Sequence, residues 1–257
     1  MSISARQLYD ELTKIIPTEL SCPWDKDGFE VCPDFNIPIE RVLVSLDVSD
    51  RVIEYAVKHG FDAIVAHHPL FFGDVGKLTG DGASGARAIK LIKNNISVMT
   101  FHTRLDANDG GVNDKLCELL ELSDVETVVN GDEKIMRTGM LENSMTPEEF
   151  AVYVKEKLNA PYVLLSSCKR AVKKVALLGG SGSDDLTLAK STGADAYLTG
   201  ELKYHQTLMA DELLMNIVCA GHFYTERPVC HVLKKTISDI APGIYAEIYG
   251  FEDIMYF

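Results

Sequence analysis

A stretch of strand, turn and helix recurs in the second half of the chain, and this repeat limits the folds that the chain can adopt. Residues 42–66 align with residues 175–199 without a gap. Both stretches read as a strand, a turn, a helix, a glycine and a second strand led by Phe61-Asp62-Ala63 or Ala194-Asp195-Ala196. Strands that alternate with helices are typical of parallel sheets. The repeat therefore predicts an α/β protein of two similar α/β domains, with mainly parallel or mixed sheets, related by an internal duplication.

The texture of the sequence changes near residue 121, and this change places the domain boundaries. Two strands joined at Asn130-Gly131, a strong hairpin signal, interrupt the alternation of strands and helices. We expect a first α/β domain at residues 1–124 and a second at residues 125–221. Residues 222–257, which read as a helix and a last strand, are expected to complete the first domain.

Composition excludes several classes of partner. The chain has 257 residues, 46% of them hydrophobic, and a formal net charge of −13. Such a charge opposes binding to nucleic acid or to an anionic membrane by bulk attraction. No stretch approaches the ~20 apolar residues of a membrane span, and residues 1–6 lack the order of a signal peptide. The six cysteines form no C-x-x-C pair, so we expect a reducing, cytoplasmic location.

Histidines and carboxylates follow several of the predicted strands. A histidine pair follows the strand at 62–66, and single histidines follow the strands at 96–101 and 216–220, each with a carboxylate four residues later. In the repeat, residues 97–102 match residues 217–222. Because the carboxyl ends of parallel strands meet at one edge of a sheet, we expect these side chains to come together. The residues are His67, His68, His102, Asp106, His222 and Glu226.

This set of residues favours a metal site over the alternative, separately hydrogen-bonded polar turn residues. Imidazoles and carboxylates without a nearby cysteine suit Zn, Mn, Fe, Co or Ni rather than a cysteine-type structural zinc site. The donors outnumber those that one tetrahedral ion uses, and a carboxylate has two oxygens with which to bridge two ions. The sequence therefore indicates a site for two divalent metal ions.

Two further segments leave alternatives open. The run Gly179-Gly180-Ser181-Gly182-Ser183 could cradle a phosphate or form a tight turn, but it lacks the spacing of known phosphate loops. Two acidic residues follow it and would repel a phosphate at the start of a helix, which favours the turn. His205 could transfer protons, or it could be half of a surface pair with Tyr204.

Four motifs, spread over nearly the whole chain, resemble the Nif-three-like dinuclear metal-binding family, whose members are often named type 2 GTP cyclohydrolase I homologues. The motifs are Ala66-His67-His68-Pro69-Leu70-Phe71, then His102-Thr103-Arg104-Leu105-Asp106 with Gly110-Gly111-Val112-Asn113-Asp114, then Thr199-Gly200-Glu201 with His205, and Gly221-His222-Phe223-Tyr224-Thr225-Glu226.

The resemblance implies a ligand set and an assembly. The implied metal ligands are His67, His68, Asp106, His222 and Glu226, with Glu226 as the bridge between two ions. His102 is then a residue that supports the ligands or binds substrate. The family fold is two similar α/β domains in a toroidal homohexamer, with the sites facing a central cavity. This chain is close to the short form of the family.

Two paired metal ions would suit a hydrolase acting on a small molecule, with His102 or His205 transferring protons. The family name implies GTP cyclohydrolase activity, in which the purine ring opens and formate leaves. The alternative is a hexameric metal-binding scaffold or regulatory protein without turnover. A scaffold would bind its ions through protein ligands alone, whereas an enzyme keeps an open coordination position.

Two residues depart from the family pattern. The usual Trp-Asp-Asn-x-Gly signature reads Trp24-Asp25-Lys26-Asp27-Gly28 here, and Arg104 stands where asparagine is usual. Neither Lys26 nor Arg104 is an expected ligand, so the departures concern contacts with the substrate rather than the metal.

Overall fold

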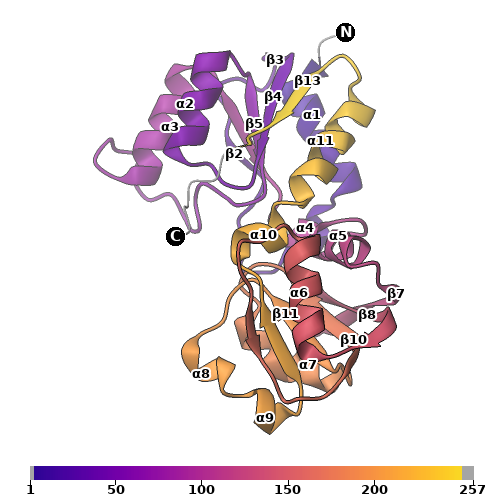
Figure 1. Cartoon of the computed structure of the whole chain (residues 1–257). Helices are drawn as coiled ribbons and strands as arrows, with labels where there is room; N and C mark the ends of the chain where they lie inside the picture. The colour runs from indigo at the N-terminus through magenta and orange to yellow at the C-terminus, as the bar shows by residue number, and fades with distance from the viewer. Residues whose placement is uncertain (1–2, 251–257) are drawn as a thin grey trace. The chain divides into compact units, whose positions relative to one another are not determined.

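The chain forms two compact units, which a computed structural model describes over residues 3–250. The first unit holds residues 3–105 and 229–250, and the second holds residues 106–228 (Figure 1). From the sequence we expected the boundaries at 124/125 and 221/222. They differ because helix α5 (Val112–Leu119) packs Leu116 into the same core as Val175 and Leu177 of the second unit, and because helix α10 (His222–Glu226) contacts α5.

The first unit is built on a five-stranded sheet with the strand order β13-β4-β5-β6-β2. The first four of these are parallel to their neighbours, and β2 pairs with β6 in the antiparallel sense. The strands are β2 (Phe29–Val31), β4 (Arg41–Ser45), β5 (Ala63–Ala66), β6 (Ser97–Thr100) and β13 (Tyr245–Ile248). A separate short ladder joins β1 (Ile3–Ser4) to β3 (Pro38–Ile39).

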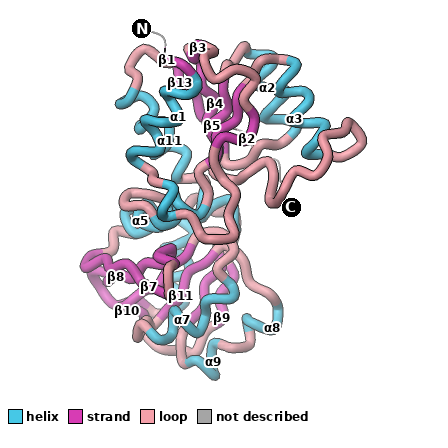
Figure 2. Tube along the Cα trace, turned by 180° about the vertical axis from the view of Figure 1, so that it is seen from behind, coloured by secondary structure: helices cyan, strands magenta, loops and turns pink. Residues whose placement is uncertain are grey.

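Helices lie on both sides of this sheet. Helices α2 (Asp50–His59) and α3 (Ala83–Lys93) contact each other on one side, and α1 (Ala5–Ile15) and α11 (Val229–Ile240) contact each other on the opposite side (Figures 1 and 2). A short 3₁₀ turn, η1, spans Thr18–Leu20. Helix α2 begins where the Ser49 side chain accepts a hydrogen bond from the amide of Val52, and it ends at Gly60 in the left-handed conformation. Serine and glycine are favoured at these two ends of a helix.

The second unit is built on a six-stranded sheet with the order β7-β8-β10-β11-β12-β9. Strands β10, β11 and β12 are parallel, and the other three are antiparallel to their neighbours. The strands are β7 (Ser123–Asn130), β8 (Glu133–Met145), β9 (Leu164–Ser166), β10 (Val172–Leu178), β11 (Ala196–Thr199) and β12 (Asn216–Cys219). Besides α5 and α10, the unit holds α6 (Pro147–Lys157), η2 (Ser183–Asp185), α7 (Leu186–Ser191), α8 (Tyr204–Thr207) and α9 (Ala210–Leu213).

The parallel strands of the two units have matching registers. Val42 of β4 lies beside Ala63 of β5, and Val175 of β10 lies beside Ala196 of β11. These are equivalent positions in the gapless alignment of residues 42–66 with residues 175–199. The repeat detected in the sequence is thus also a repeat of strand pairing.

An aspartate at the start of the second repeated strand fixes this register in each unit. Asp62 accepts hydrogen bonds from the amides of Glu40 and Arg41, where β4 begins. Asp195 accepts hydrogen bonds from the amides of Lys173 and Lys174 in the same way. The shared Asp-Ala step is therefore a structural feature, because its carboxylate ties the start of one strand to the next.

The third repeated strand corrects the sequence alignment by one residue. Ala63 pairs with Ser97, and Ala196 pairs with Asn216, so Ser97 corresponds to Asn216 rather than to residue 217. The alignment had matched the two histidines that follow these strands. Gly221, at a positive φ of 88°, takes the position equivalent to His102, and His222 comes one residue later, as the first residue of α10.

In residues 3–250 we find no helix that combines the length and the apolar character needed to cross a membrane.

Candidate metal centre

The histidine pair lies directly beyond the buried strand β5. The amide of His67 donates to Ser45 at 3.3 Å and the amide of His68 donates to Leu46 at 2.8 Å, so the ladder with the neighbouring chain segment continues until Pro69. The two imidazole rings do not diverge as they would on a regular strand, because their centroids are 4.8 Å apart. His67 is fully buried, and the side chain of His68 is 11% exposed.

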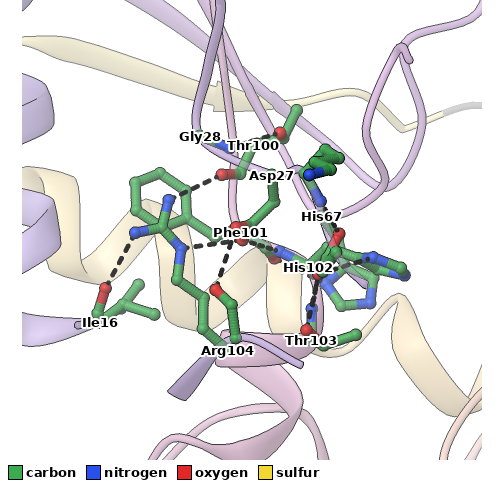
Figure 3. A network of polar contacts seen from close by, with 12 residues as sticks. Ile16, Asp27, Gly28, His67, Thr100, Phe101, His102, Thr103 and Arg104 are labelled. Atoms are coloured by element: carbon green, nitrogen blue, oxygen red, sulfur yellow. Dashed lines mark hydrogen bonds and ion pairs between the residues drawn. The ribbon is translucent and has the colours of Figure 1, made fainter. Parts of the chain in front are cut away.

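Each ring of this pair is held through its Nδ1 atom. His67 Nδ1 lies 2.9 Å from the carbonyl oxygen of Phe101 (Figure 3), and His68 Nδ1 lies 2.9 Å from a carboxylate oxygen of Asp47. A carbonyl or carboxylate oxygen only accepts, so Nδ1 carries the proton in both rings. A neutral ring then presents the lone pair of Nε2, which is the arrangement usual in metal-binding histidines.

His102 joins the histidine pair. One nitrogen atom from each of His67, His68 and His102 falls within a group whose members are at most 4.8 Å apart, a spacing that could hold a metal ion. His102 Nδ1 lies 3.1 Å from a carboxylate oxygen of Asp25, whose side chain is 2% exposed. His102 therefore has a carboxylate beside its Nδ1 atom, as His68 does, but as an ion-pair neighbour rather than a hydrogen-bond acceptor.

Asp25 stays ionised beside His102. Burial by itself would raise the pKa of Asp25, but the ion pair with His102 and hydrogen bonds from the Thr103 hydroxyl and amide outweigh it and hold the pKa well below its usual range. Asp25 thus presents a fixed negative charge to the His102 ring.

Arg104 is a buried structural residue. Its side chain is 0% exposed and its Nε donates to Asp27 at 2.8 Å. Its remaining nitrogens donate to the carbonyl oxygens of Ile16 and Thr100 (Figure 3). Arg104 stands where the family usually has asparagine, and its charge is balanced by Asp27, the variable residue of the tryptophan signature. This departure therefore affects the buried framework under His102 rather than an exposed contact surface.

The second unit supplies a histidine and a glutamate from one short helix. His222 and Glu226 are four residues apart on α10, and His222 Nε2 lies 2.8 Å from Glu226 Oε2. His222 Nδ1 lies 2.6 Å from a carboxylate oxygen of Glu201. An imidazole between two carboxylates needs a positive charge on the Nε2 side, which either a proton or a metal ion supplies.

Gly180 allows the close approach of Glu226. A side-chain carbon at Gly180 would lie 1.9 Å from Glu226 Oε1 and 3.2 Å from His222 Nε2, and the residue has a positive φ of 66°. Gly200 is similarly close, because a side-chain carbon there would lie 2.8 Å from the Cα atom of His222. Both glycines are needed where they are because the backbone packs directly on the candidate ligands.

The glycine-rich run around Gly180 is a tight turn. Three of its amides donate to side chains of the second unit: Gly179 to Asn113, Gly180 to Thr225, and Gly182 to Thr199. Amides engaged in this way do not point at a phosphate. The structure thus favours the turn, which supports the candidate ligands of α10, over the phosphate loop.

Two remaining sequence candidates have different surroundings. Asp106, on the short helix α4 (Thr103–Ala107), is 9% exposed. His205 is exposed on α8, and the hydrogen bonds and ion pairs described for residues 3–250 do not join it to His222 or Glu226. A role for His205 in proton transfer stays a prediction.

Sequence reasoning missed the carboxylates that orient the imidazoles, namely Asp25, Asp47 and Glu201. Asp47 and Glu201 each lie 21 residues before the histidine they contact. Each follows a strand parallel to the one that precedes its histidine, β4 beside β5 and β11 beside β12. A search for acidic residues just after the strand that pairs with the histidine's own strand would have found both Asp47 and Glu201.

The residues present fit a divalent metal ion. Three imidazoles, those of His67, His68 and His222, have Nδ1 hydrogen-bonded to a carbonyl or carboxylate oxygen. The carboxylate that faces His222 Nε2, that of Glu226, is 5% exposed. Neutral Nε2 atoms and buried carboxylates are the ligands that borderline divalent ions prefer. The described residues of the first unit therefore contain a candidate group of three metal-ligating histidines, and α10 of the second unit carries two further candidate ligands, His222 and Glu226.

Comparison with known proteins places this geometry in a family. The chain is 34% identical over 230 residues to a "GTP cyclohydrolase 1 type 2 homolog" of Clostridium perfringens, covering 88% of this chain and 87% of that protein. A protein of the same name from Clostridium acetobutylicum is 30% identical over 245 residues, covering 92% of this chain and 90% of that protein.

Solved structures share the fold. A Bacillus cereus protein related to NIF3 matches with a TM-score of 0.91 at 22% identity, over 100% of this chain and 99% of that one. Reduced HcgD from Methanocaldococcus jannaschii matches with a TM-score of 0.86 at 27% identity, over 98% of this chain and 99% of that one. The family model Duf34/NIF3 (NGG1p interacting factor 3) matches residues 3–252. The chain therefore belongs to the Duf34/NIF3 family.

Proposed function

We propose that the protein is a metal-dependent hydrolase of a small molecule, in which His67, His68, Asp106, His222 and Glu226 together hold two divalent ions. The observation that carries the proposal is the anchoring of Nδ1 in three of these residues, which leaves Nε2 to bind a metal. Family membership and the order of the motifs support joining the ligands of both units into one set.

The chain's own residues then have distinct tasks. Divalent ions held by this set would lower the pKa of a bound water toward neutrality and polarise an oxygen of the substrate. His102, held by Asp25 at 3.1 Å, would accept or donate a proton at Nε2. Glu201 and Asp47 fix the orientation of His222 and His68.

The substrate and assembly are the finer part of the proposal. The curated relatives carry the name GTP cyclohydrolase 1 type 2 homolog, which supports a purine ring-opening hydrolysis. The ions would be Zn, Fe, Mn, Co or Ni. We further propose a toroidal homohexamer in the cytoplasm, and six free cysteines agree with a reducing compartment.

Metal content and turnover test the proposal. Protein stripped by a chelator and reloaded with each metal would be measured for ions per chain and for hydrolysis of nucleotides, phosphoesters and cyclic amides. We expect two ions per chain in the wild type and in the control H59Q, whose histidine lies at the end of α2, and fewer in H68Q and H222Q. We expect E201Q to weaken metal affinity about 10–100-fold.

The same measurements separate the enzyme from the scaffold. If the fully loaded protein hydrolyses no compound in the panel while E226A disrupts assembly, the hydrolase proposal fails and a metal-binding scaffold is the better account. If H68Q and H222Q bind as much metal as the wild type, the ligand set itself is refuted.

A further inference from the structure

Two exposed aromatic rings flank the imidazole of His102. Trp24 is 60% exposed and Phe72 is 73% exposed. The Trp24 ring lies 5.9 Å from the His102 ring at an interplanar angle of 75°, and the Phe72 ring lies 6.0 Å away at 90°. The two rings come from separate loops, one after η1 and the other after β5, yet both touch the same side chain.

Both loops are held in place by buried or half-buried carboxylates. Asp25, next to Trp24, accepts hydrogen bonds from the amide and hydroxyl of Thr103. Glu30 accepts hydrogen bonds from the amides of Leu70 and Phe71, directly before Phe72. The backbone beneath each exposed ring is therefore positioned in advance, which lowers the entropy that a ligand would have to overcome.

The exposure of these rings is unlike that of a ring that packs on the protein. Phe35, which is 43% exposed, covers the Arg6 guanidinium at 4.0 Å and the Phe29 ring at 5.3 Å. Trp24 and Phe72 instead leave most of their surface open beside a polar imidazole. Apolar walls next to a few placed polar groups are the usual composition of a small-molecule site.

We propose that Trp24 and Phe72 form an aromatic subsite that holds a planar heteroaromatic ring of the substrate beside His102. The subsite deepens the proposed function, on which it rests for the identity of the site. Stacked or edge-on contacts with the two rings favour a flat, π-bonded ligand, and the His102 imidazole can hydrogen-bond to a ring nitrogen or oxygen. A sugar phosphate or an aliphatic chain offers no such face.

The chain contains one tryptophan, so its fluorescence reports on this subsite directly. Inosine and uridine would be titrated as flat probes, and ribose 5-phosphate as a probe without a planar ring. Fluorescence would be excited at a wavelength longer than those that the nucleosides absorb, and saturation-transfer NMR would be a second readout. The variants are W24L, which is read by NMR alone, F72L and the control Y162L, which removes a 49% exposed ring from the second unit.

We expect inosine and uridine to quench Trp24 and ribose 5-phosphate to leave it unchanged. W24L and F72L should each weaken nucleoside binding about tenfold, the scale of stacking on one aromatic side chain, whereas Y162L should bind like the wild type. Zinc content should be the same in all four proteins. If nucleosides bind but no substrate is hydrolysed, the hydrolase proposal fails and the proposed aromatic subsite is still supported.

Three results would overturn the subsite. The first is no nucleoside binding to the zinc-loaded wild type, and the second is equal binding by the wild type and the double variant W24L/F72L. The third is a loss of zinc, or a change of oligomeric state by light scattering, that accompanies the weaker binding, because the rings would then act by holding the metal residues or a second copy of the chain.

Discussion

Replacing Asp27 by asparagine should destabilise the first unit by about 3 kcal/mol, because it leaves a buried guanidinium without its counter-ion. The side chains of Arg104 and Asp27 are 0% and 3% exposed. Asp27 also accepts from the His102 amide at 2.8 Å and from the Ser21 hydroxyl at 3.1 Å. An asparagine can keep an oxygen toward Arg104 and an amide toward Ser21, so D27N removes charge while preserving shape and most hydrogen bonds.

The size of the effect follows from burial. Removing one partner of a buried ion pair costs about 3–5 kcal/mol, and D27N belongs at the lower end because Arg104 keeps the carbonyl oxygens of Ile16 and Thr100 as acceptors. R104M leaves the buried Asp27 carboxylate without a counter-ion and should lower the free energy of unfolding by at least as much as D27N. The double variant should cost less than the sum of the two, since neither charge is then left alone. The exposed pair of Lys90 and Glu54 is the control, and E54Q should cost below ~1 kcal/mol.

Urea unfolding followed by the fluorescence of Trp24 measures this effect in the first unit, where the single tryptophan lies. We would abandon the buried ion pair if D27N lowers the free energy of unfolding no more than E54Q does, or if the effects of D27N and R104M simply add. Either result would mean that water reaches the pair and that Arg104 is not locked under His102.

Two further predictions concern Gly180 and Glu30. G180A should lower metal affinity at least tenfold, because its added carbon would meet Glu226 at 1.9 Å. The control G193A changes a glycine that also has a positive φ but has open space around it, so it should lose some stability and keep its metal affinity. Equal metal affinity in both variants would contradict this prediction. Burial raises the pKa of Glu30 to about 7, although hydrogen bonds from the backbone amides of Leu70 and Phe71 oppose the rise. The folded protein then holds a proton that the unfolded protein releases, so the free energy of unfolding of the wild type, relative to that of E30Q, should fall as the pH rises from 4.5 to 7. A constant difference over that range would show that Glu30 ionises normally.

Much of the sheet framework follows from local sequence. The strand, helix and second strand predicted within residues 42–66 correspond to β4, α2 and β5, because strand burial and helix capping depend on neighbouring residues. Strand β2 was missed since it is three residues long and joins its sheet through a pairing with β6 that no local pattern encodes.

The candidate ligands could be found from sequence, whereas their supports could not. His68 and His222 stand out because they follow buried strands. Asp47 and Glu201 are ordinary exposed acids until the parallel strands bring them to the two imidazoles. The role of Arg104 was also hidden, because its partner Asp27 lies 77 residues away.

Anomalous X-ray diffraction from crystals of the zinc-loaded protein tests the central claim most directly. We expect two anomalous peaks per chain, with metal bonds from the Nε2 atoms of His67, His68 and His222. A protein that binds no zinc, that binds it through Nδ1, or that holds it away from these three histidines would not have the proposed metal site.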